Sequence, residues 1–358
     1  AIFHLDVAEL LGQLALRHPG VSQRIKPKAL AELDLVRGLQ PKDPAVLLRL
    51  ADQNLALGRT NLSEQILSQM TGPGSRNPMA SAKLAEMYLR SGRLDDAAAQ
   101  LEALRRVAPA NPMPPYYLGV IALDRRQFDK AAEWFEKSLL LDPTQEAAHV
   151  DLVTALLSAR KFNEAADVVG KARLRMKPSF RLEYLASICF GRLKRNAPAL
   201  DAMDRAEKAA EGDPRLLDHR FHFQYAVALE QAGRGDDSLA RAEKSLSLKP
   251  DFAAALNFLG YSWAEKGVRL AEARGMIEKA VAAEPENAAY LDSLGWVLFK
   301  LGKPNEALSH LEKAVSVLKD EPDATVLEHL GDVLEALGRK DQARDAWERA
   351  VKADGSPA

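Results

Sequence analysis

The sequence has few of the residues on which cross-links, membrane spans and nucleic-acid contacts depend. Cys189 is the single cysteine in 358 residues, so no disulfide can form within the chain, and its neighbours Ile188 and Phe190 favour a buried thiol. No run approaches the roughly 18 continuous apolar residues of a membrane span. Lys and Arg number 49 against 50 Asp and Glu, whereas a general nucleic-acid binder is usually clearly basic.

Motifs for catalysis and cofactor binding are also missing. The sequence contains no phosphate-binding glycine loop followed by Lys-Ser/Thr, no His-Glu-x-x-His and no Gly-x-Ser-x-Gly. His219 and His222 are three positions apart, but two histidines without a third ligand are a weak metal signal. We therefore expect no enzymatic activity, no cofactor and no metal site.

The residues that are abundant favour helix. Alanine and leucine dominate the composition, aromatic residues make up only 6% of it, and the Val/Ile runs are short. None of those runs alternates between turn signals as a strand would. The sequence therefore predicts an all-α fold.

Small residues recur with a period close to 34. Each member of one series is Ala or Ser, at Ser63, Ala97, Ala131, Ala165, Ala199, Ser238, Ala273, Ala307 and Ala343. A second, mostly small series lies about 12 residues upstream, and prolines recur at 109, 143, 178, 214, 250, 285 and 322. This spacing predicts pairs of closely packed helices joined by short turns such as Ser91-Gly92-Arg93, in which glycine takes a positive φ. Neighbouring pairs must then bury each other's apolar faces.

These positions resemble the tetratricopeptide repeat (TPR) family. The matching residues include Tyr117-Leu118-Gly119, Ala131, Phe135 and Pro143, and later Leu259-Gly260, Trp263, Ala273, Ala280 and Pro285. The resemblance implies a right-handed α-solenoid superhelix of about nine repeats. Their expected ranges are near 44–77, 78–111, 112–145, 146–179, 180–218, 219–252, 253–287, 288–323 and 324–356.

Two regions depart from the regular pattern. Residues 1–43 look like a degenerate helix pair, with helices over 5–17 and 27–38 separated by a break at His18-Pro19-Gly20, and we interpret this pair as an N-terminal cap. Five extra residues around 211–218 predict a longer loop or longer helices at that point.

In such stacks the first helix of each pair lines the concave face, so the resemblance also implies which side chains point into the groove. The expected partner-binding residues are Met113, Tyr116, Val120, Leu123, Tyr184, Ile188, Arg192, Phe223, Val227, Tyr261, Asp292, Trp296, Phe299 and Asp332. An apolar stripe that faces water usually marks a binding surface. Two alternatives stay open: the register is off by one and these residues are core, or the N-terminal helix or a neighbouring copy fills the groove.

Acidic groove positions collect toward the C-terminus, at Glu265, Asp292, Glu328, Asp332 and Glu335. Like charges on one wall steer a complementary partner, so we expect a ligand with an apolar stretch and a basic end. Two specialised grooves are not expected. A carboxylate clamp needs Lys and Asn around a Gly-Asn step, and an asparagine ladder needs one Asn per repeat, whereas Asn257 stands nearly alone.

The main functional interpretation is a non-catalytic scaffold or adaptor that binds an extended peptide or a helix of a partner protein. The segment from Ala255 to Trp296 resembles the C-terminal repeats of bacterial TPR envelope lipoproteins, which implies envelope assembly or protease adaptation. One alternative is a cytoskeletal or membrane-linking adaptor, similar in role to kinesin light chains. Another is a self-assembling structural protein.

Cellular location stays open between cytoplasm and periplasm. The chain starts at Ala1 rather than Met, so we expect that a targeting segment was trimmed. Membrane contact is expected only through a removed anchor or the N-terminal helix, and nucleic acid is not an expected partner.

Overall fold

The computed structural model describes residues 1–72, 77–177 and 179–354. Over these residues the chain forms twenty α-helices and one short 3-10 turn, with no strand, which confirms the predicted all-α repeat fold. The expected ranges 44–77, 146–179 and 324–356 each include residues that lie outside the described part. No helix in the described part is both long and apolar enough to cross a bilayer.

The chain divides into two compact units, Ala1–Lys177 and Pro178–Ala358, named unit 1 and unit 2 here. The sequence pattern had not indicated a division at this point. Unit 1 contains α1 (Ile2–Arg17), α2 (Pro19–Gly38), α3 (Pro44–Ala56), α4 (Thr60–Thr71), α5 (Pro78–Arg90), α6 (Leu94–Val107), α7 (Met113–Asp124), α8 (Phe128–Leu141), α9 (Glu146–Ser158) and α10 (Phe162–Arg173).

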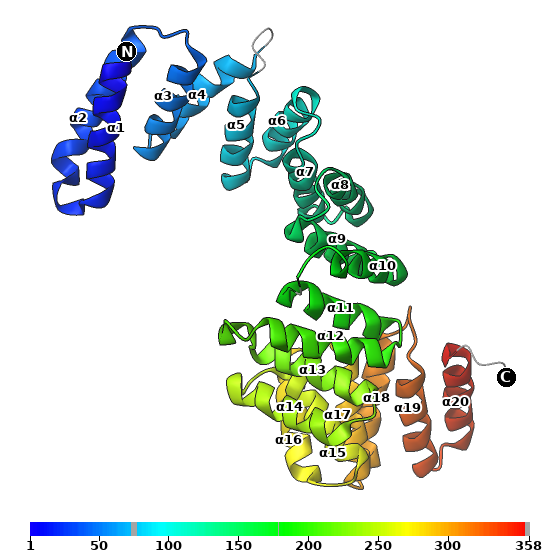
Figure 1. Cartoon of the computed structure of the whole chain (residues 1–358). Helices are drawn as coiled ribbons and strands as arrows, with labels where there is room; N and C mark the ends of the chain where they lie inside the picture. Colours follow the sequence, from blue (N-terminus) through cyan, green and yellow to red (C-terminus); the bar gives the residue numbers. More distant parts are fainter. Residues whose placement is uncertain (73–76, 178, 355–358) are drawn as a thin grey trace. The chain divides into compact units, whose positions relative to one another are not determined.

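Unit 2 continues the same succession of helix hairpins (Figure 1). It contains α11 (Phe180–Arg192), α12 (Asn196–Ala209), the 3-10 turn η1 (Pro214–Leu216), α13 (His219–Gln231), α14 (Gly235–Leu248), α15 (Ala253–Glu265), α16 (Leu270–Ala283), α17 (Ala288–Lys300), α18 (Pro304–Val317), α19 (Ala324–Ala336) and α20 (Lys340–Asp354). The five extra residues near 211–218 are accommodated by η1 and its flanking loop.

The N-terminal helix pair differs in detail from the expectation. The second helix starts at Pro19 rather than Pro27, because Pro19 occupies the first helical turn, where a missing N–H costs nothing, and Pro27 is tolerated inside the helix. Ion pairs join the pair to the next hairpin: Arg49 contacts Asp6 at 2.8 Å and Glu9 at 2.7 Å.

Turns between the helices of a pair share one backbone conformation. A residue with positive φ recurs at equivalent positions, at Gly58, Gly92, Arg126, Arg160, Lys194, Gly233, Gly267, Gly302 and Gly338. This confirms the role predicted for glycine at Gly92 and Gly302, with φ of 72° and 75°. In three consecutive repeats a long cationic residue adopts the same strained conformation.

Close helix packing depends on the second series of small residues. A Cβ atom built on Gly295 would lie 2.6 Å from Cγ of Leu311, and one on Gly260 would lie 2.7 Å from Cγ1 of Ile277. Each glycine thus receives a large side chain from the second helix of its own pair. In unit 1 one buried cluster extends from Leu5 to Ile121, and in unit 2 the buried side chains form several clusters along the succession of hairpins.

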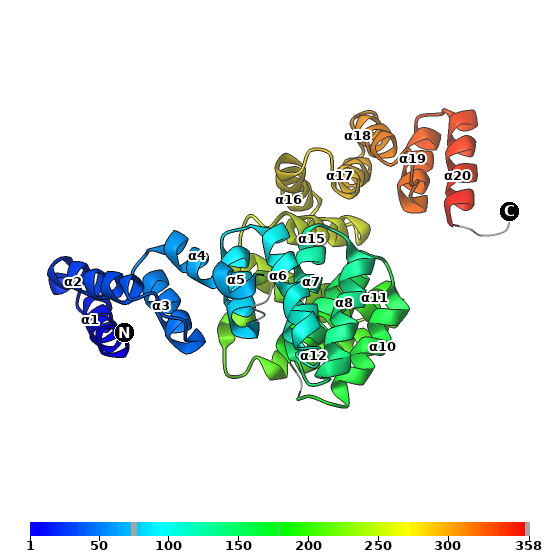
Figure 2. The same ribbon diagram turned by 90° about the horizontal axis from the view of Figure 1, so that it is seen from above.

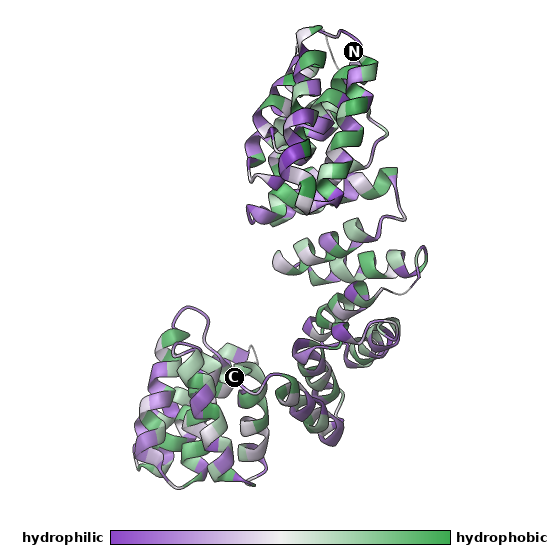
Figure 3. Ribbon diagram, turned by 90° about the vertical axis from the view of Figure 1, so that its left-hand side faces the viewer, coloured by the Kyte–Doolittle hydropathy of each residue, from purple (hydrophilic) through white to green (hydrophobic). Residues whose placement is uncertain are grey.

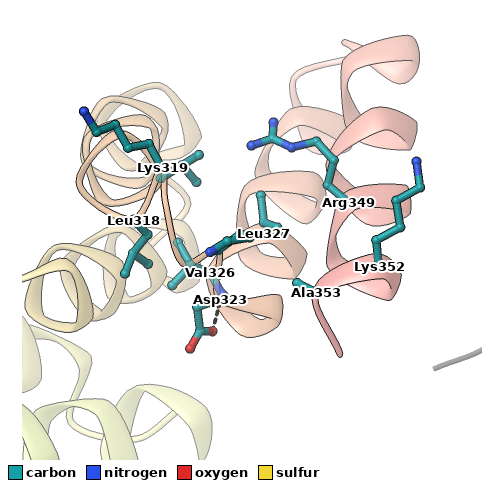
Figure 4. Close-up of a pocket in the computed structure, with 10 residues that line it drawn as sticks. Leu318, Lys319, Asp323, Val326, Leu327, Arg349, Lys352 and Ala353 are labelled. Carbon is teal, nitrogen blue, oxygen red and sulfur yellow. Dashed lines mark hydrogen bonds between the residues drawn. The ribbon is translucent and has the colours of Figure 1, made fainter. Parts of the chain in front are cut away.

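The helices are amphipathic. Figure 3 shows hydrophobic and hydrophilic residues interspersed along the helices of both units. In unit 2 the hairpins α17–α18 and α19–α20 lie next to each other (Figure 2), and Leu291, Ala314 and Val326 form a buried cluster between them. This neighbour-to-neighbour burial is what a single hairpin cannot provide for itself.

Candidate partner-binding surface

First helices of neighbouring pairs contact one another in unit 2. α11 contacts α13, α15 contacts α17, and α17 contacts α19, in addition to the contacts within each hairpin. We call these first helices the inner helices. Side chains from different repeats therefore meet on these helices.

Four ring side chains meet on α15, α17 and α19, and we call them the inner aromatic cluster: Tyr261, Trp296, Phe299 and His329. The imidazole of His329 stacks on the indole of Trp296, with ring centroids 4.0 Å apart and an interplanar angle of 15°. Tyr261 lies 6.3 Å from the same imidazole, and Phe299 lies 5.4 Å from Trp296. Three repeats thus contribute to one aromatic wall.

Polar groups hold this cluster in place. Nδ1 of His329 lies 2.9 Å from Oδ1 of Asp292. The indole N–H of Trp296 donates to Glu265, and Nζ of Lys300 lies 4.5 Å from the centre of a Trp296 ring. Burial, with the nearby carboxylates of Glu265 and Asp292, raises the pKa of the Tyr261 phenol to about 12. Tyr261 therefore remains a neutral hydrogen-bonding group throughout the physiological range.

Exposure within the cluster differs from the expectation of an open stripe. Asp292 and Trp296 are only 6% and 7% exposed, because His329 covers both of them. Tyr261, Phe299 and Asp332 are half-buried and present part of their surface to solvent. Asp332 is also engaged, since it accepts a hydrogen bond of 3.2 Å from the indole N–H of Trp347.

The sequence reasoning missed His329. It follows the expected groove position Glu328 by one residue, and the repeat pattern does not distinguish it. Its proximity to Trp296 and Asp292 is a property of the stacking of α19 on α17, and the only signal in the sequence is a histidine beside a groove position.

The other predicted residues of unit 2 lie on α11 and α13. Tyr184 is half-buried and stacks on Phe180 with ring centroids 6.0 Å apart, and burial raises the pKa of its phenol. Phe223 meets Phe252 and Phe258 edge-on at 5.4 and 5.9 Å. Ile188 and Val227 are half-buried, and Arg192 is exposed.

The predicted residues of unit 1 all lie on α7. Met113 is 40% exposed, whereas Tyr116, Val120 and Leu123 are half-buried. The hydroxyl of Tyr116 donates to Oδ2 of Asp151 on α9 at 2.8 Å, which orients the phenol across two inner helices. α7 and α9 are first helices of neighbouring pairs and contact each other, as the inner helices of unit 2 do.

The chemistry of these surfaces is that of recognition. Burial raises the pKa of the Cys189 thiol to about 11, so the thiol is a poor nucleophile at neutral pH. In the described part of the chain no three His, Cys, Asp or Glu side chains are grouped as metal ligands. Partly exposed aromatic rings bordered by carboxylates suit apolar and cationic side chains of a polypeptide.

Hairpins of two helices, stacked so that each packs on the next, define a helical repeat protein. A tetratricopeptide repeat model matches residues 82–146, 223–288, 268–316 and 293–358, which is more than half of the sequence. The chain belongs to the tetratricopeptide repeat family, whose members are protein-interaction scaffolds.

Similar proteins include the TPR repeat-containing protein PA4667 of Pseudomonas aeruginosa, which is 33% identical over 124 residues. The match covers 34% of this chain and 21% of that protein, so it spans about a fifth of the relative's length. Two solved structures are similar in part. YrrB, described as a TPR protein with an unusual peptide-binding site, is 22% identical, covers 55% of this chain and 97% of its own, and has a TM-score of 0.45. MamA from Desulfovibrio magneticus RS-1 is 18% identical, covers 51% of this chain and 99% of its own, and has a TM-score of 0.44.

Proposed function

We propose that this chain is a non-catalytic scaffold that binds an extended or helical segment of a partner protein on the inner helices of unit 2. The inner aromatic cluster carries the proposal, because the buried rings of Trp296 and His329 support two partly exposed rings, Tyr261 and Phe299, from successive repeats. Aromatic residues that are anchored by their neighbours lose little entropy on binding and dominate interface energetics.

The bound segment is expected to combine apolar residues with at least one basic residue. Glu265, Glu328 and Glu335 are exposed on α15 and α19, the helices that flank Trp296. Carboxylates near aromatic faces favour cations, and they disfavour an acidic segment by like-charge repulsion. Asp292 contributes less to this field because it is buried against His329.

Site-specific photocrosslinking tests this function. p-Benzoylphenylalanine at Phe299 should form defined adducts with a small set of proteins in the native host, because Phe299 is part of the inner aromatic cluster and half-buried. The matched control is the same probe at Lys279, an exposed position on α16, the second helix of its pair. Identical adducts from both positions would rule out a specific role for the inner surface.

A second measurement addresses the chemistry of the segment. A short peptide of alternating leucine and lysine should bind the chain more tightly than its leucine–glutamate counterpart, and Phe299→Ala should weaken binding by about tenfold. Equal affinity for the two peptides would contradict the electrostatic part of the proposal and leave the photocrosslinking result standing.

A further inference from the structure

A second surface, on the outer side of unit 1, has features of a docking site. A pocket of about 330 Å³ lies between α8 and α10, over α9. Its apolar walls are Leu139 and Leu140 from α8, Leu152 from α9 and Val168 from α10. Its charged lining residues are Glu136, Lys171 and Arg175. This surface, which we call the outer basic pocket, is separate from the residues of the inner aromatic cluster.

Two strongly exposed leucines belong to this part of unit 1, and one of them, Leu140, lines the pocket. Leu140 is 83% exposed and Leu174 is 88% exposed, the highest values among the large hydrophobic side chains of the described residues. They occupy equivalent positions in consecutive repeats, 34 residues apart. Single exposed leucines are common on protein surfaces, but Leu140 extends the apolar surface of a pocket that it lines.

Basic side chains outnumber acidic ones around the pocket: Lys171 and Arg175 line it together with one carboxylate, Glu136. Residues 171–177 contain Lys171, Arg173, Arg175 and Lys177 and no acidic residue, whereas the equivalent segment 137–143 contains one lysine and one aspartate. Chain-wide the charges nearly cancel, so this local excess is a property of one repeat. A basic rim on an apolar pocket complements a segment that carries carboxylates beside an apolar residue.

The pocket lining also contains a buried polar atom. His149 also lines the pocket and is 2% exposed. Its Nε2 lies 3.0 Å from the carbonyl oxygen of Pro143, and its Nδ1 is buried without a hydrogen-bond partner. Because Nε2 must carry the proton to donate to that carbonyl, Nδ1 is left as an acceptor. An unsatisfied buried polar atom is unusual and calls for a role.

From these observations we propose that the outer basic pocket binds an acidic amphipathic segment of a partner protein, with one apolar side chain inserted between α8 and α10. The recessed walls favour a protein ligand over a lipid surface. Leu152 and Val168 are 2% and 8% exposed, within reach of an inserted side chain but below the level at which a flat bilayer makes contact. The inserted residue supplies apolar burial, and its flanking carboxylates meet Lys171 and Arg175.

Two labelled helical peptides test the proposal by fluorescence anisotropy on the full chain. Both carry leucine along one face; one has glutamate on its flanks and the other has lysine. The glutamate peptide should bind at least about tenfold more tightly, with an affinity that falls as salt rises. Lys171→Glu combined with Arg175→Glu should abolish or reverse this preference, and Leu140→Asp should weaken the glutamate peptide by a similar factor.

The matched control is Lys279→Glu combined with Arg344→Glu, which changes the charge equally at exposed positions on the second helices of unit 2. This variant should keep the wild-type preference. All substituted side chains are exposed, and circular dichroism verifies that each variant is folded. Equal binding of the two peptides, or the same loss in the control variant, would overturn the proposal. So would loss of binding to phosphatidylglycerol vesicles in the Lys171/Arg175 variant with no peptide preference in the wild type, since that outcome assigns the patch to a membrane.

Discussion

Oδ1 of Asp292 on α17 lies 2.9 Å from Nδ1 of His329 on α19, a residue 37 positions later in the chain. Both side chains are almost completely buried, at 8% and 9% exposure. The imidazole also stacks on Trp296, which lies one helical turn after Asp292. One residue of the last described hairpin therefore fixes both an acid and an indole of the preceding hairpin.

Removal of this carboxylate should destabilise unit 2. Asp292→Ala leaves a buried nitrogen of His329 without its partner, and we expect a loss of about 1–3 kcal/mol in the free energy of unfolding by urea. Asp292→Asn retains a hydrogen-bonding side chain of the same size and should lose less. The control is Asp320→Ala at an exposed position, and an equal effect of Asp320→Ala would contradict a structural role for the pair.

Two glycine substitutions should change the free energy of unfolding in opposite directions, because one glycine is tightly packed and the other is not. Gly295→Ala should cost about 1–3 kcal/mol, because the new methyl group would lie 2.6 Å from Cγ of Leu311. Gly275→Ala should instead stabilise by up to about 1 kcal/mol, since Gly275 lies inside α16 with no atom within 4 Å of the added carbon. Chemical denaturation of the two variants measures both signs, and a neutral Gly295→Ala would show that the helices can separate freely.

A second pair of substitutions tests the turn position at which a positive φ recurs. Arg126 has a φ of 56° at the turn position that Gly92 occupies, with a φ of 72°, in the preceding repeat. A residue with a side chain is less stable than glycine in this left-handed conformation by about 1 kcal/mol. Arg126→Gly should therefore raise the melting temperature, and the reverse exchange Gly92→Arg should lower it. If both substitutions shift the melting temperature in the same direction, the left-handed conformation is not what determines stability at these turns.

Two histidines of unit 2, the buried His222 and the half-buried His310, should make the stability of the fold depend on pH. Burial is the main cause that lowers the pKa of both His222 and His310 below the ordinary value of 6.5, and nearby Arg241 and Lys313 act in the same direction. The unfolded chain then binds more protons than the folded chain near pH 6, so stability is complete above about pH 7 and falls as the pH drops through the unfolded value. Folded-state burial thus makes mild acid destabilising.

Urea unfolding at about pH 7.5 and about pH 5.5 measures this dependence. The difference in the free energy of unfolding between the two pH values should be smaller in His222→Gln and His310→Gln than in the wild type. Because carboxylates titrate lower than this window, an unchanged difference in both variants would contradict the assignment to the two histidines.

Much of the repeat fold could be predicted because its signals are local. Small residues such as Ala97 and Gly295 recur at regular spacing wherever two helices approach, and glycine recurs where a turn needs positive φ. The spacing could not locate the start of α2 correctly. Proline lacks a backbone N–H, yet α2 accommodates both Pro19 in its first turn and Pro27 in its interior. It also could not identify Arg126 as a left-handed turn residue, because nothing in arginine favours that conformation.

The sequence by itself determined the period and the helix pairs, because each depends on residues a few turns apart, whereas the groove positions are an expectation from the family resemblance. Only the tertiary structure decided which of those positions are covered and which are open. Trp296 is buried because His329, from the next repeat, stacks on it, while Phe299 retains partial exposure. The outer basic pocket arises in the same way, from side chains of α8, α9 and α10 that only packing brings together. The exposure of a side chain depends on neighbours that are distant in the sequence, so it cannot be predicted from the periodicity of one helix.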